Sequence, residues 1–247
     1  MTLEIELLLA AFALAAGGIL KGATGAGAPV LAVPMLALIF DVRYAVALLV
    51  VPNLVTNFWQ WWQFRDKIVS RGLVLRFAGG GALGALIGSF MLAYAPQDAL
   101  LMGIGVMLIA YIAFRLVHTN WSLPSKQALR FSGPAGLLGG ILQGASGLSA
   151  PASITFLNAA GLERQQFIPT ISVFFMMMSV MQIPALAGLG ILTGKILLHG
   201  ALALAVLLVA MPVGNQLARH VKKETFDRII LALLALIAAK ILVTPFF

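Results

Sequence analysis

The chain has 247 residues, of which 61% are hydrophobic and only 10% are charged, whereas a soluble domain carries roughly 25% charged residues. Together with a mean hydropathy of +1.03, this composition excludes an ordinary soluble domain and indicates an integral membrane protein in a lipid bilayer. The net charge of +8 does not point to nucleic acid, because basic residues beside membrane spans are expected, and the lack of cysteine excludes disulfides and thiolate chemistry.

The first apolar segment runs from Leu3 to Leu20 and predicts a membrane helix. Its acidic Glu4 and Glu6 stand where a signal peptide would carry positive charge, so no cleavage is expected. The stretch GATGAGAP then interrupts the segment, and an apolar run resumes from Val30 to Phe40. Such long apolar runs indicate helices, because barrel strands would show alternating segments of about 10 residues.

The stretch around this interruption occurs twice in the chain. Residues 17–30 read GGILKGATGAGAPV and residues 139–152 read GGILQGASGLSAPA, so each residue of the second copy follows its counterpart by 122 positions. Nine of the fourteen positions are identical. We infer an internal duplication, with an N-terminal half over 1–120, a C-terminal half over 131–247 and a polar linker over 118–130.

Each interrupted segment is followed by three apolar runs that are long enough to span a bilayer. They cover 44–64, 73–94 and 100–117 in the first half, and 167–189, 197–217 and 229–243 in the second half. Gly80, Gly84 and Gly88 lie four residues apart, a spacing that favours close helix packing, within the protomer or in a homodimer, over a substrate role. His199, near the end of its span, is expected to be solvated.

The distribution of charge predicts the topology. If each interrupted segment enters the bilayer and returns to the side it came from, twelve of the sixteen Lys and Arg residues fall on one face. That face, which includes the linker, is expected to be cytoplasmic, with both termini outside. The two halves then have opposite orientations. The sequence predicts an all-α polytopic inner-membrane protein with two inverted-topology repeats, each opening with a Gly/Pro-broken helical hairpin followed by three spans, and about eight transmembrane elements.

The two broken segments have the chemistry of an anion site. Inverted repeats with breaks at matching positions are typical of secondary transporters, whose substrate lies near the midplane where the breaks meet. Glycines permit the backbone to leave the helix, and Pro29 and Pro151 suit the first turn of the returning half-helix. The N–H groups of that turn favour an anion. All carboxylates lie in loops or at segment ends, so neither a metal nor another cation is expected at mid-membrane, and no cofactor is expected.

The predicted substrate-binding residues come from the breaks and from the spans that follow them. Hydroxyls and a lysine lie at the breaks, and polar groups on one face of residues 53–60 have counterparts in the second half. The full set is Lys21, Gly22, Thr24, Gly25, Gly27, Asn53, Asn57, Gln60, Gln143, Gly144, Ser146, Gly147, Ser149, Ser179 and Gln182. The alternatives are that the glycines serve only helix packing and the polar groups only interhelical hydrogen bonds. Lys21, which matches Gln143, is either a charge partner of the substrate or a cytoplasm-facing anchor.

The duplicated GGILKGATGAGAPV and GGILQGASGLSAP stretches, the overall length and the tandem halves resemble the TauE/SafE family of sulfite and organosulfonate exporters, also called the toluene-sulfonate uptake permease family. The resemblance covers the whole chain. It implies a permease for anions such as sulfite, sulfoacetate, isethionate or taurine-derived products, with the breaks lining the substrate path.

The leading hypothesis is therefore a secondary transporter of a small organosulfur anion that works by alternating access, with export implied by the resemblance alone. A small-anion channel and a non-transporting membrane assembly factor are the alternatives. An enzyme is disfavoured, because no nucleophile, base and carboxylate converge within the membrane.

Overall fold

The computed structural model describes residues 2–68, 70–117, 122–220 and 223–243, and every regular element in these ranges is a helix. The first half contains α1 (Leu3–Thr24), α2 (Ala28–Ile39), α3 (Val42–Phe64), the 3₁₀ turn η1 (Arg65–Lys67), α4 (Arg71–Tyr94) and α5 (Gln97–Val117). The second half contains α6 (Ser125–Ser146), α7 (Ala150–Ala159), α8 (Arg164–Gly188), α9 (Gly194–His220) and α10 (Lys223–Val243). The predicted all-α class is confirmed.

Side-chain caps decide where several helices begin. At the start of α3, Asp41 Oδ1 accepts a hydrogen bond from the N–H of Tyr44 at 2.7 Å. Ser70 caps α4 in the same way, and Glu163 begins α8 with a capping box. A capping oxygen satisfies an N–H group that has no partner within the helix. The helices therefore begin two or three residues before the apolar runs that predict them.

The predicted linker is shorter than expected. Helix α6 begins at Ser125, so residues 125–130 are helical, and the prediction of a loop there is wrong. Residues 118–121 lie outside the described part of the chain. The prediction followed hydropathy, yet Lys126, Gln127 and Arg130 are polar residues with good helix propensity, so a polar composition did not prevent a helix.

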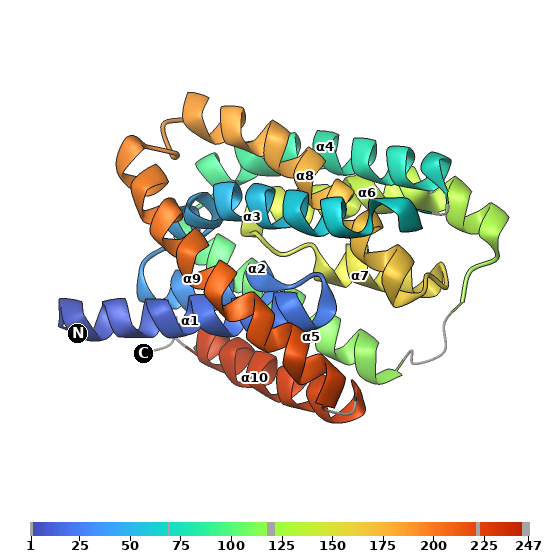
Figure 1. Cartoon of the computed structure of the whole chain (residues 1–247). Coiled ribbons are helices and arrows are strands. Elements are labelled where there is room, and N and C mark those ends of the chain that lie inside the picture. Colours follow the sequence, from blue (N-terminus) through green and yellow to red (C-terminus); the bar gives the residue numbers. More distant parts are fainter. Residues whose placement is uncertain (1, 69, 118–121, 221–222, 244–247) are drawn as a thin grey trace.

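The helices run roughly along one common direction, so that their ends gather at two ends of the molecule (Figure 1). The last residues of α3, α5, α7 and α9 lie toward the right of the figure, whereas the start of α1 and the end of α10 lie toward the left. We call the left end the terminal end and the right end the basic end. The basic end carries Arg65, Lys67, Arg71, Arg115, Lys126, Arg130, Arg164 and Arg219.

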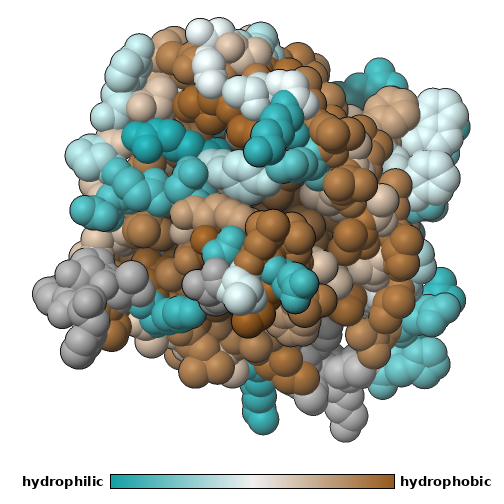
Figure 2. Space-filling model, turned by 90° about the vertical axis from the view of Figure 1, so that its left-hand side faces the viewer, coloured by the Kyte–Doolittle hydropathy of each residue, from teal (hydrophilic) through white to brown (hydrophobic). Residues whose placement is uncertain are grey.

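Six of the described helices are long and apolar enough to cross a membrane, namely α1, α3 with η1, α4, α5, α8 and α9. Large hydrophobic side chains such as Leu75, Leu198 and Val209 are exposed on their outer faces, and hydrophobic surface dominates the view in Figure 2. A surface of this kind is stable in contact with lipid chains, within which helices satisfy their own backbone hydrogen bonds.

Among the described helices, α4 and α6 share the most extensive contact. A Cβ atom on Gly84 would clash with the carbonyl oxygen of Leu137, and one on Gly80 would clash with that of Gly133. Gly88 faces α6 in the same manner. The predicted packing role of these glycines is confirmed, and the face that they form is filled within the protomer.

Side chains tie the helices together at the terminal end. The Arg43 guanidinium donates hydrogen bonds to the carbonyl oxygens of Leu92 at 3.0 Å and Ala95 at 2.6 Å, at the end of α4. The Tyr44 hydroxyl lies 2.7 Å from His199 Nδ1 and joins α3 to α9. The expectation that His199 is simply solvated is therefore wrong, because α3 supplies a partner that the sequence does not place beside it.

Candidate functional site

The first helix break lies within the predicted GATGAGAP stretch. Helix α1 ends at Thr24 and α2 begins at Ala28. Gly25 has φ 81° and Gly27 has φ 133°, backbone angles that residues with a side chain rarely adopt. The N–H of Gly25 closes α1 by donating to the Lys21 carbonyl at 2.7 Å, and a proline occupies the first turn of α2, where its missing N–H needs no partner. The predicted break is confirmed.

The second break has the same construction. Helix α6 ends at Ser146 and α7 begins at Ala150. Gly147 has φ 73°, and its N–H donates to the Gln143 carbonyl at 2.7 Å. Pro151 lies in the first turn of α7. The duplicated sequence therefore folds into duplicated local structure.

Two of the predicted loop glycines serve a different purpose. Gly22 and Gly144 lie inside α1 and α6, not in the breaks. A Cβ atom on Gly22 would clash with the Met211 carbonyl oxygen of α9, and one on Gly144 would clash with the Ala85 carbonyl oxygen of α4. These glycines permit close helix packing, and the prediction that they form the loop is wrong, because the helices continue until Thr24 and Ser146.

Each break lies against a long helix of the other half. A Cβ atom on Gly25 would lie 2.6 Å from Ile168 Cγ1 of α8, and one on Gly147 would lie 3.2 Å from Val46 Cγ2 of α3. Ile168 follows Val46 by 122 positions, the same interval that separates the two breaks. The contacts between the halves therefore repeat the symmetry of the sequence.

Replacing Gly147 with alanine is expected to destabilise the protein more than replacing Gly190 with alanine. Both glycines have φ 73°, so both changes add the same left-handed strain, about 1–2 kcal/mol. A Cβ atom on Gly147 would in addition lie 2.8 Å from Val33 Cγ2, whereas one on Gly190 meets no described atom within 4 Å. Unfolding in detergent should show a further loss of about 1–3 kcal/mol for Gly147→Ala. Equal losses would contradict tight packing at the break.

A buried polar cluster lies beside the first break. Lys21 is 0% exposed, and its Nζ donates a hydrogen bond to Asn57 Oδ1 at 2.9 Å. Asn57 Nδ2 in turn donates to Asn53 Oδ1 at 2.8 Å. The ring of Phe175 faces Lys21 Nζ at 5.8 Å from its centroid, within cation–π range. Because Lys21 is buried, it is not a cytoplasm-facing anchor.

Three glutamines extend the cluster toward the second break. Gln60 Nε2 donates to the Lys21 carbonyl at 3.5 Å, and Gln182 Nε2 donates to the Gly144 carbonyl at 3.4 Å. The Oε1 atoms of Gln60 and Gln143 are buried and have no hydrogen-bond partner among the described residues. Asn53, Gln143 and Gln182 line a cavity of about 10 Å³, roughly the size of one water molecule. We call the six residues Lys21, Asn53, Asn57, Gln60, Gln143 and Gln182 the central polar cluster.

The hydroxyl groups of the predicted site do not join this cluster through hydrogen bonds. Thr24 Oγ1 donates to the Leu20 carbonyl at 2.8 Å, and Ser146 Oγ donates to the Leu142 carbonyl at 2.7 Å. Ser149 Oγ accepts from the hydroxyl of the next helical turn at 3.0 Å. Ser179 is buried in α8. The predicted residues therefore form two groups. The lysine and the amide side chains belong to the central polar cluster, whereas the hydroxyl groups of Thr24, Ser146 and Ser149 form local hydrogen bonds.

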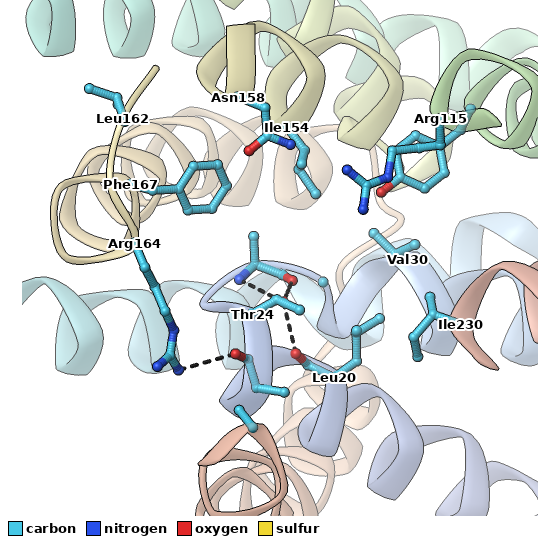
Figure 3. A pocket seen from close by; sticks show the side chains of 15 residues that line it. Leu20, Thr24, Val30, Arg115, Ile154, Asn158, Leu162, Arg164, Phe167 and Ile230 are labelled. Carbon is cyan, nitrogen blue, oxygen red and sulfur yellow. Dashed lines mark hydrogen bonds between the residues drawn. The ribbon is translucent and has the colours of Figure 1, made fainter. Parts of the chain in front are cut away.

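A larger cavity, about 340 Å³ in volume, opens at the basic end. We call it the vestibule; the first break and the ends of α5, α7, α8 and α9 surround it. Figure 3 shows the Arg115 guanidinium pointing into this space, whereas the Arg164 side chain runs along the opposite side toward the end of α1. Arg164 Nη2 donates to the Ala23 carbonyl at 3.1 Å, so an arginine of the second half holds the end of α1.

The sequence predicted Thr24 and Gly27 of the vestibule lining as binding residues but not Arg115, Asn158 or Arg164, because the two arginines count among the basic residues of the face expected to be cytoplasmic. A signal was nevertheless present. At the positions 122 residues away, Arg164 corresponds to Val42 and Asn158 to Leu36. Each pair breaks the internal repeat as strongly as Lys21 and Gln143 do, and a comparison of the two halves at every position would have marked these residues.

Two broken helix pairs enclose a buried polar cluster in an all-helical fold, and six described helices are able to cross a membrane. These features define a multi-pass membrane protein. The chain matches the family model described as sulfite exporter TauE/SafE over residues 9–241, and it belongs to that family. The chain has no match among curated proteins and none among solved structures. Membership confirms the resemblance seen in the duplicated stretches and places the protein in a transporter family.

Proposed function

We propose that the protein is a secondary transporter that exports a small organosulfur anion such as sulfite, sulfoacetate or isethionate. The observation that carries this proposal is Lys21, a buried lysine at a helix break whose hydrogen-bond partner is the neutral Asn57. No salt bridge joins Lys21 to a carboxylate among the described residues. A buried charge is stabilised by an opposite charge, and an anionic substrate supplies one. The family description supports sulfite or a related anion.

We infer that transport proceeds by alternating access between two halves of inverted orientation. The bounds of α6 are those of α1 shifted by 122 residues. Helix α1 packs on α9 as α6 packs on α4, and α3 packs on its own counterpart α8. In Figure 1 the chain runs from left to right along α3 and from right to left along α8. Halves related in this way can exchange conformations and open a shared site to each end in turn.

The central polar cluster is the proposed substrate site. Its amides offer donors to an oxyanion, and Lys21 offers a charge. The first turns of the two half-helices, at Pro29 and Pro151, offer further N–H donors. We place the basic end in the cytoplasm, because positive charge favours that side of the inner membrane.

Purified protein in vesicles tests this function. We expect saturable uptake of radiolabelled sulfite or isethionate, and faster uptake when the vesicles are preloaded with the unlabelled anion, because a carrier returns faster when it is loaded. An impermeant maleimide on an Asp66→Cys variant of this cysteine-free chain reports the orientation of the protein. Uptake that neither saturates nor responds to preloading would indicate a channel, and no uptake of any organosulfur anion would contradict the proposal.

A further inference from the structure

The described residues at the terminal end do not repeat the charged lining of the vestibule, although the chain is duplicated. Moving by 122 positions replaces the two arginines and the asparagine of the vestibule with apolar residues: Arg164 with Val42, Arg115 with Ile237 and Asn158 with Leu36. Val42 and Leu36 are 0% exposed and belong to the hydrophobic core. The region that corresponds to the vestibule is therefore filled by packed side chains and carries no charge at these positions.

The terminal end is also held closed by polar contacts. Arg43 joins the start of α3 to the end of α4, and Tyr44 joins α3 to His199 of α9. At the basic end the 340 Å³ vestibule reaches Thr24 and Gly27 at the first break. The structure is thus a conformation that is open toward the basic end.

The vestibule combines positive charge with apolar walls. Arg115 and Arg164 contribute two guanidinium groups, and none of the described residues that line the cavity is acidic. Arg164 commits one of its N–H groups to the Ala23 carbonyl, and a guanidinium has five. Leu20, Ile154 and Phe167 supply apolar surface. A cleft of one charge sign with walls of low polarity concentrates ions of the opposite sign.

The size of the two cavities separates their roles in this conformation. The central polar cluster encloses about 10 Å³, whereas the vestibule offers about 340 Å³, within the usual range for small-molecule pockets. An organic anion of a few carbon atoms fits the vestibule, and it reaches the central polar cluster only after the cluster expands.

We propose that the vestibule is a separate binding site for a small organic oxyanion, which it collects at the basic end before the anion passes to the central polar cluster. The oxyanion head lies near Arg115 and the Asn158 amide, the Arg164 guanidinium adds positive charge on the opposite side, and the carbon chain lies against the apolar wall. Because the terminal end lacks these charges, the transporter has a lower KM for the anion at the basic end than at the terminal end. This inference rests on the proposed function and adds a site to it.

Charged thiol reagents test the site without requiring transport. An Asn158→Cys variant is reacted with anionic sulfonatoethyl methanethiosulfonate, itself an organic sulfonate, and with cationic trimethylammonioethyl methanethiosulfonate. The control is Ser125→Cys, an exposed position at the same end outside the cavity. We expect the ratio of the anionic to the cationic reaction rate to be about 10-fold higher for Asn158→Cys than for Ser125→Cys. Adding Arg164→Gln or Arg115→Gln should reduce this excess severalfold, and propanesulfonate should slow the anionic reaction in phosphatidylcholine vesicles.

The possible results separate this inference from the proposed function. Equal ratios at the two cysteines, or an excess that survives both arginine replacements, would overturn the vestibule site even if uptake is normal. The anionic reaction is also measured in vesicles that contain phosphatidylglycerol. If this lipid slows the reaction but propanesulfonate does not, the vestibule holds a lipid headgroup, and the proposal is overturned. A charge-dependent ratio with propanesulfonate protection, in a protein that transports no organosulfur anion, would support the site and contradict the transport function.

Discussion

Replacing Lys21 with glutamine is expected to lower anion uptake about 100-fold while the protein stays folded. Loss of one member of a buried charge pair typically removes 3–5 kcal/mol. Because about 1.4 kcal/mol corresponds to a factor of ten, a 100-fold loss is about 2.8 kcal/mol, just below that range. The substitution leaves an N–H donor for Asn57 Oδ1 and reproduces the residue found at the equivalent position, Gln143. Uptake by reconstituted vesicles measures the effect.

The same variant separates a functional lysine from a structural one. Burial of a charge without an opposite charge is unfavourable, so the melting temperature of Lys21→Gln in detergent should be unchanged or higher. Lys195→Gln is the matched control, because Lys195 is exposed at the start of α9, and its uptake should equal that of the unmodified protein. Normal uptake by Lys21→Gln would remove the central polar cluster as the anion site, and a lower melting temperature would assign Lys21 to structure.

Replacing Gly84 with alanine is expected to destabilise the protein by about 2–3 kcal/mol, as overpacking of a tight interface does. The Cβ atom would clash with the carbonyl oxygen of Leu137 and would lie 2.7 Å from the amide nitrogen of Ile141. Both are backbone atoms of α6, which cannot move away as a flexible side chain can. Without a hydrophobic driving force in lipid, helix association depends on this close packing. Denaturant unfolding in detergent measures the loss.

Gly79→Ala is the matched control for Gly84→Ala. It makes the same chemical change on the same helix, and its Cβ atom meets no described atom within 4 Å. Alanine has a higher helix propensity than glycine by about 1 kcal/mol, so Gly79→Ala should be neutral or slightly stabilising. If both variants lose equal stability, the contact between α4 and α6 is looser than the structure indicates, and packing does not explain the glycine spacing.

The central polar cluster was only partly predictable. The spacing of Asn53, Asn57 and Gln60 places them on one helix face, which is a local property of any helix. Their meeting with Lys21 joins residues that are 36 positions apart and depends on how α1 packs against α3. The vestibule required still more distant contacts, because Arg164 bonds to Ala23 across 141 positions.

Composition, hydropathy and the duplicated stretches were sufficient to predict a helical membrane protein of the TauE/SafE family with two broken segments. Hydropathy is a property of each segment, and glycine and proline affect the backbone at their own positions. These features can therefore be predicted from the sequence. The packing of the helices was needed to show that Gly22 contacts α9 whereas Gly25 bends the chain, and that a cavity opens at the basic end. Those outcomes depend on which helices meet, and helix pairing is set by contacts between residues far apart in the sequence.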